Sequence, residues 1–130
     1  MTLNLGISRT VKLDFDDAVV RVKEVFKENG FGAVTEMDVK KILKEKIGAD
    51  FKKYTILGMC NPKIAMEAIG VSDDIGLLLP CNVCVYENKD GETVVSAINP
   101  ETLLGLVDIK EMNEKASIVK EKIIKSIDNI

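Results

Sequence analysis

The sequence predicts one compact α+β domain over residues 1–130, with its elements in the order β-α-β-α-β-α-β-β-α. Two observations lead to this prediction. The chain has 130 residues, of which 46% are hydrophobic and 30% charged, which is typical of a single globular domain that buries its own core. Segments with apolar residues at helical spacing alternate along the chain with short apolar segments that are typical of strands.

In the first half of the chain, two strands are each followed by a helix. Residues 3–13 alternate loosely between apolar and polar side chains and are predicted to form the first strand. Asp14 is expected to cap a helix that ends at Gly30. Residues 31–37 are the second strand, and Asp38 is expected to cap a second helix. The buried stripe of this second helix is expected to consist of Val39, Ile42, Leu43 and Ile47.

The middle of the chain holds two further strands on either side of a short helix. Residues 54–60 form a third strand, after which Asn61 caps a helix with Pro62 at its first position. Residues 75–86 are the most apolar segment and are predicted to form a central strand. Pro80 is expected to interrupt this strand, because proline cannot donate a hydrogen bond to a ladder.

The chain then turns back and ends in a long helix. Residues 88–91, Asn-Lys-Asp-Gly, are typical of a hairpin turn that leads to a returning strand at residues 92–98. A short helical turn is expected to end at residue 104. The last helix, residues 108–130, carries an apolar stripe that fits either a coiled-coil seam or packing on a sheet, and we favour core packing.

The composition excludes several kinds of function. The chain contains no histidine, which removes a Ser-His or Cys-His catalytic pair, a histidine metal site and a histidine general base. The net charge is −3, and we expect no nucleic-acid partner. Residues 40–53 contain six lysines and two acidic residues, Glu45 and Asp50, so this segment has a local charge of +4. A solvated helix face explains this charge better than an anion site does.

The cysteine content and the hydropathy indicate a reducing compartment. Three cysteines, an odd number in a chain long enough for its own core, argue against a disulfide framework. No apolar run approaches the roughly 20 residues that cross a bilayer, and the first residues do not resemble a signal peptide. We therefore expect a cytoplasmic protein with no membrane partner. We expect no metal and no cofactor.

Cys81 and Cys84 have the C-x-x-C spacing of redox and zinc motifs, but their surroundings fit neither. Residues 77–86 are predicted as strand, and in an extended chain two residues three apart lie about 10 Å from each other on opposite faces. A disulfide needs its Cα atoms within about 7 Å. A zinc site would need a second ligand pair, and only Cys60 remains.

Two Cys-Asn pairs are candidate functional residues. Cys60 and Asn61 end a strand just before a helix, where free amide groups lower the pKa of a thiol. Cys81 and Asn82 follow Pro80 on a neighbouring strand and could meet the first pair in space. Cys60 is either a buried small hydrophobe, which we favour, or a reactive thiol. The asparagines either cap turns, which we favour, or bind a small polar ligand.

These segments resemble a known family. Residues 54–62, Tyr-Thr-Ile-Leu-Gly-Met-Cys-Asn-Pro, and residues 76–83, Gly-Leu-Leu-Leu-Pro-Cys-Asn-Val, are similar to the family called domain of unknown function 302. The similarity runs through most of the chain. Cys60 and Cys81 fall on the family pattern, whereas Cys84 stands where an aliphatic residue is expected. The resemblance implies helices packed on a mainly antiparallel sheet and a tendency to form homodimers, but it implies no reaction.

Two functional hypotheses follow. The first is a homodimeric domain that binds a small ligand or a protein partner, and its expected ligand-binding residues are Tyr54, Asn61, Pro62, Pro80 and Asn82. The second is a thiol-dependent enzyme or redox sensor with Cys60 and Cys81 as its catalytic candidates. For the homodimer, residues 92–98 are expected to be an edge strand that needs covering. The last helix is expected to add aliphatic surface from Ile123, Ile124, Ile127 and Ile130.

Overall fold

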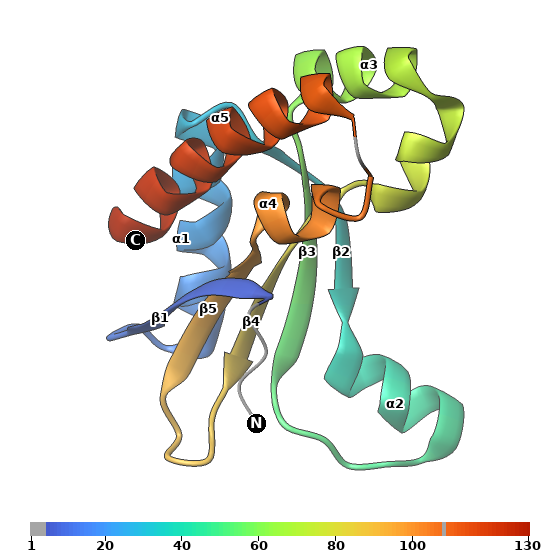
Figure 1. Cartoon of the computed structure of the whole chain (residues 1–130). Coiled ribbons are helices and arrows are strands. Elements are labelled where there is room, and N and C mark those ends of the chain that lie inside the picture. The colour runs from blue at the N-terminus through green and yellow to red at the C-terminus, as the bar shows by residue number, and fades with distance from the viewer. Residues whose placement is uncertain (1–4, 108) are drawn as a thin grey trace.

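The computed structural model describes residues 5–107 and 109–130, so the expectations for residues 3, 4 and 108 lie outside it. Figure 1 shows strands and helices in the predicted alternation. The strands are β1 (Gly6–Val11), β2 (Gly32–Asp38), β3 (Tyr54–Cys60), β4 (Cys81–Glu87) and β5 (Thr93–Ile98). The helices are α1 (Phe15–Glu28), α2 (Val39–Ile47), α3 (Pro62–Val71), the 3₁₀ helix η1 (Asp73–Leu78), α4 (Pro100–Leu104) and α5 (Lys110–Asp128).

The strands form one sheet in the order β1-β5-β4-β3-β2, and every neighbouring pair is antiparallel. This confirms the predicted α+β class with an antiparallel sheet. The prediction that the strand at residues 92–98 lies at an edge was wrong. β1 pairs along the whole of β5, from Gly6 opposite Ile98 to Val11 opposite Thr93, so the edges of the sheet are β1 and β2.

The segment from residue 75 to residue 86 is not one strand. Its first part belongs to η1, where the Ser72 hydroxyl accepts a hydrogen bond from the Asp74 amide at 3.4 Å. The Leu79–Pro80 peptide bond is cis, and β4 begins at Cys81. The strand starts only there because Pro80 has no amide hydrogen for the ladder. From Cys81 onward the segment is a central strand, as predicted.

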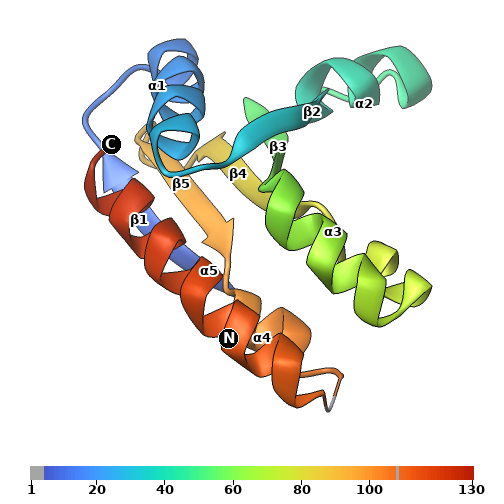
Figure 2. The ribbon, with the colours of Figure 1, turned by 90° about the horizontal axis from the view of Figure 1, so that it is seen from above.

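Helices α1 and α5 cover one face of the sheet and enclose the main core. Leu57, Val83, Val85 and Val95 of the sheet are buried against these two helices. Figure 2 shows the two helices together at one side of the molecule. The apolar stripe of α5 consists of core residues, which confirms core packing: Met112, Ala116, Val119, Ile123 and Ile127 are all buried. The expectation that this stripe contributes dimer surface was therefore wrong for Ile123 and Ile127.

Because side chains alternate along a strand, the residues between these core positions face the opposite way. We call that side the open face; it carries Ile56, Gly58, Asn82, Cys84 and Tyr86. An antiparallel sheet can expose one face to water while the other carries the core. Within the described residues, none of the helices has the length and hydropathy needed to span a membrane.

Helix α2 differs from its predicted environment. Asp38 caps it as expected, with its carboxylate accepting a hydrogen bond from the Lys41 amide at 3.0 Å. Its apolar stripe, however, is not buried: Ile47 is 72% exposed, Ile42 is 36% exposed, and no residue of α2 is buried. Figures 1 and 2 show why, because α2 projects beyond the β2 edge, away from α1 and α5.

Candidate functional site

A groove lies at the end of the open face where β4 begins. Its volume is about 190 Å³. Four elements line it, namely the end of η1, the start of β4, the end of β5 and the helix α4. The lining residues are Leu77, Leu78, Leu79, Pro80, Asn82, Ile98 and Leu103. Two of the predicted ligand-binding residues, Pro80 and Asn82, therefore lie together in one hollow, and the leucines were not predicted.

Local sequence signals hold the wall of this groove in place. The side-chain carbonyl oxygen of Asn99 accepts a hydrogen bond from the backbone amide of Glu101 at 3.1 Å and so caps α4. Pro100 occupies the first turn of that helix, where a missing amide hydrogen has no cost. This short capped helix carries Leu103 to the groove opposite the leucines of η1.

The position of Pro80 in the groove depends on Gly58. Gly58 of β3 pairs with Asn82 of β4. A Cβ atom at position 58 would lie 2.1 Å from Thr35 Oγ1 and 2.6 Å from Pro80 Cγ. The absence of a side chain therefore lets Thr35 and the Pro80 ring close over β3 from two sides. Pro80 can occupy its position in the groove because residue 58 has no side chain.

Asn82 is the polar group of the groove. It is exposed, and its amide has no hydrogen-bond partner among residues 5–107 and 109–130. A side-chain amide offers two donors and an acceptor. The remaining lining side chains are hydrocarbon, so the groove combines apolar walls with one amide that can orient a ligand.

Asn61 and Pro62 form the start of helix α3. The Asn61 side-chain oxygen accepts a hydrogen bond from the Ile64 amide at 3.2 Å, and Pro62 stands at the first turn of α3. Both features agree with the expected cap. The Asn61 amide nitrogen also lies next to Gly30, 3.2 Å from where a Cβ atom would be. Neither residue lines the groove, so the structure does not bring Asn61 and Asn82 into one pocket.

Tyr54 lies further along the open face, four residues before Gly58 on β3. Its ring stacks on that of Tyr86, with centroids 5.4 Å apart and planes 12° apart. The Lys52 ammonium lies 4.8 Å from the Tyr86 ring centroid. A hydrogen bond with Cys84, helped by burial, raises the pKa of Tyr54 to about 12. Tyr54 does not line the groove, and its contacts tie β3 to β4.

The three cysteines are all free and half-buried. Cys81 lies opposite Met59, on the side of the core, whereas Cys84 lies opposite Ile56 on the open face. The structure thus confirms that Cys81 and Cys84 point to opposite faces of one strand. Cys81 pairs with Met59, and Cys60, the last residue of β3, follows Met59 directly. Burial, and secondarily the neighbouring Cys60, raises the pKa of the Cys81 thiol.

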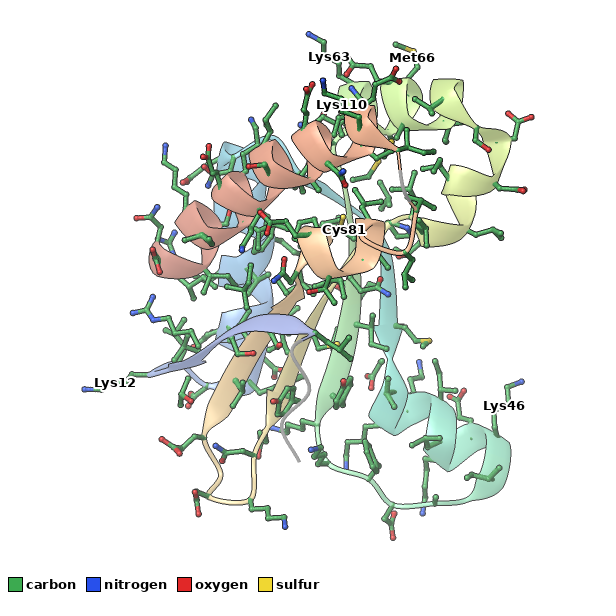
Figure 3. All side chains as sticks on the ribbon, viewed as in Figure 1. Lys12, Lys46, Lys63, Met66, Cys81 and Lys110 are labelled. Atoms are coloured by element: carbon green, nitrogen blue, oxygen red, sulfur yellow. The ribbon has the colours of Figure 1, made fainter. Side chains whose placement is uncertain are left out.

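A second, partly enclosed cavity of about 40 Å³ adjoins the groove. It is bounded by α3, α4, α5 and the Cys81 side chain, and Figure 3 shows Cys81 between α4 and α5. Leu78, Leu79 and Leu103 line both the cavity and the groove. These leucines were missed because their apolar run was assigned to a strand. The Ser72 cap and Asp73-Asp74 before the run were the signals for a helical turn.

Comparisons with known proteins agree with this architecture. A family model described as "Domain of unknown function DUF302" matches residues 7–130. A crystal structure of an uncharacterized conserved protein DUF302 from Bacillus stearothermophilus superposes with a TM-score of 0.90 at 26% sequence identity, and 98% of each chain is covered. The search of curated proteins finds no match. No group of three or more His, Cys, Asp or Glu side chains suited to a metal ion occurs within the described residues.

Proposed function

Because the chain belongs to the family described as domain of unknown function DUF302, whose description gives no activity, we propose a function from the geometry of the site. The protein is a homodimeric binding domain of the cytoplasm that takes a small ligand in the groove beside Pro80 and Asn82. The observation that carries this proposal is the exposed, unpartnered amide of Asn82 inside a groove of hydrocarbon side chains. Ligand sites typically combine such apolar walls with a few convergent polar groups.

The homodimer rests on α2. A helix of nine residues is only marginally stable on its own in water, and helices of this length depend on packing of their apolar face. On the apolar face of α2, Ile42 and Ile47 are exposed instead, and Phe51, which follows the helix, is 40% exposed. A second copy that brings its own α2 against this face would bury both stripes and close the assembly by two-fold symmetry.

The thiol hypothesis is the weaker alternative. A reactive cysteine is accessible and has a lowered pKa, whereas burial raises the pKa of Cys81. Cys81 also lines the smaller, partly enclosed cavity and not the groove. These properties make Cys81 a poor nucleophile, although its position beside Cys60 is what the hypothesis of a resolving partner requires.

We expect Cys81 to react with iodoacetamide more slowly in the folded protein than in the same chain unfolded in urea, at neutral pH. The raised pKa leaves less thiolate, and only the thiolate is alkylated. Peptide mass spectrometry at successive times gives the rate for each cysteine separately. Faster alkylation of Cys81 in the folded chain would favour the thiol hypothesis over ligand binding.

Ligand binding is tested by thermal shift with a broad metabolite panel. We expect at least one compound to raise the melting temperature of the wild-type protein, since ligands that bind only the native state stabilise it. Asn82→Arg places a long side chain in the groove and should abolish the shift. Asn113→Arg makes the same change at an exposed position of α5 outside the groove and should preserve it. If no compound raises the melting temperature of the wild-type protein, or if the same compound raises that of Asn82→Arg equally, the ligand proposal is wrong.

A further inference from the structure

We propose that the groove and the partly enclosed cavity that adjoins it are two parts of one pocket, and that this pocket takes an aliphatic chain with a neutral carbonyl head group. The proposal rests on the ligand site proposed above and specifies the chemistry of its ligand. The carbonyl group lies at Asn82, and the hydrocarbon chain runs inward between α4 and η1 toward Cys81. The groove and cavity, of about 190 and about 40 Å³, are smaller than the roughly 300–1,000 Å³ of drug-sized sites, so the chain is short.

The wall between the two spaces consists of side chains that can move. Leu78, Leu79 and Leu103 line both spaces, and all three are half-buried. They belong to a 3₁₀ helix, the residue after it, and a helix of five residues. Side-chain rotamers at such partly exposed positions change quickly. A change of rotamer at Leu78 or Leu103 therefore joins the groove to the cavity without unfolding either element.

The cavity favours hydrocarbon over water. Its lining is apolar except for Lys115, whose ammonium is held by the Glu67 carboxylate at 2.5 Å. An ordered water needs two to four polar partners, and this apolar lining offers few, so burial of hydrocarbon against it is favourable. The cavity also lies beside a boundary between two core clusters, because its lining residues Ile75 and Met112 belong to a small cluster that is separate from the main core. Methylene groups of a ligand that enter this boundary gain van der Waals contacts with the lining side chains that are missing in the empty cavity.

The head group is specified by what surrounds Asn82. The groove contains no lysine or arginine, so no charge compensates a carboxylate that leaves water. The Asn82 amide can donate to a carbonyl oxygen and accept from an amide hydrogen. A neutral acyl compound, such as a primary amide of a short fatty acid, satisfies these conditions better than a free acid or a simple alkane does.

The proposal is tested by calorimetric titration of the wild-type protein with butanamide, pentanamide and hexanamide, and with hexanoate. Each added methylene should raise the affinity roughly fourfold, from about 0.8 kcal/mol per buried methylene. Hexanoate should bind more weakly than hexanamide. Ala65→Leu adds carbon to the cavity wall on α3 and should remove the increase with chain length while butanamide still binds. Asn82→Leu should lower the affinity for every amide about threefold to tenfold.

Each outcome separates this inference from the site on which it rests. Affinities that do not change with chain length, or hexanoate that binds as well as hexanamide, would overturn the two-part pocket. If the amides fail to bind while another compound of the metabolite panel binds at Asn82, the inference is wrong and the ligand site stands. If neither amides nor panel compounds bind the wild-type protein, both proposals fall.

Discussion

Replacement of Gly58 by alanine is expected to lower the free energy of unfolding by about 1–3 kcal/mol, the usual cost of overpacking a filled site. The new Cβ atom would meet Thr35 Oγ1 at 2.1 Å and Pro80 Cγ at 2.6 Å. The Pro80 ring cannot rotate away as a flexible chain would, so β4 must shift at its first residues. Urea unfolding measures the change, and the same shift should widen or distort the groove.

Two variants make this test specific. Gly32→Ala changes another strand glycine, at which a Cβ atom meets nothing within 4 Å, so its stability should change little or rise slightly. Thr35→Ala removes the nearer clash, so the double variant with Gly58→Ala should recover part of the loss. If Gly58→Ala and Gly32→Ala are equally stable, the close approach of Thr35 and Pro80 over β3 does not exist in solution.

Replacement of Ile42 and Ile47 by glutamate is expected to convert the proposed homodimer into a monomer of 14.3 kDa. Both side chains lie exposed on α2, so a charge there costs the single subunit little, but it would be buried in the proposed interface. Lys44 and Lys46 are also on α2 and accommodate the added negative charge locally. Analytical ultracentrifugation at micromolar concentration gives the mass of the wild type and the variant.

Val20→Lys is the matched control for this experiment. Val20 is 55% exposed on α1, far along the chain from α2, and Asp17 and Glu24 on the same helix accommodate a lysine. This variant should remain dimeric. A wild-type mass that stays at 14.3 kDa at all concentrations would contradict the homodimer. A dimer that survives glutamate at both isoleucines would place its interface elsewhere.

The parts of the fold that the sequence predicts well are those fixed by neighbouring residues. Strand β3 occupies residues 54–60, as expected, and α3 follows with Asn61 as its cap and Pro62 in its first turn. The hairpin turn before β5 likewise carries its own signal at Gly91, which has a positive φ of 76°. Such caps and turns act through local hydrogen bonds and backbone angles, which can be deduced from a short stretch of residues.

Except for the leucines of η1, whose local signal was Ser72 with Asp73 and Asp74, the errors concern features that depend on distant segments. Strand β5 is internal because β1, more than 80 residues earlier, pairs with it, and no pattern within β5 records this. The stripe of α2 has the periodicity of a buried helix, but burial requires a partner that this subunit does not supply. The groove combines η1, β4, β5 and α4. Pro80 and Asn82 could be proposed from their motif, whereas Leu103 depends on tertiary packing alone.

We propose the groove beside Pro80 and Asn82, and not the cysteine pair, as the ligand site. The most direct test of this proposal is an NMR titration of the wild-type protein with the panel compound that gives the largest thermal shift. We expect the signals of the Asn82 side-chain amide and of the Leu77 and Leu103 methyl groups to move with a single binding curve. Changes confined to Cys60 and Asn61, or to α2, with the groove signals unmoved, would contradict the proposal.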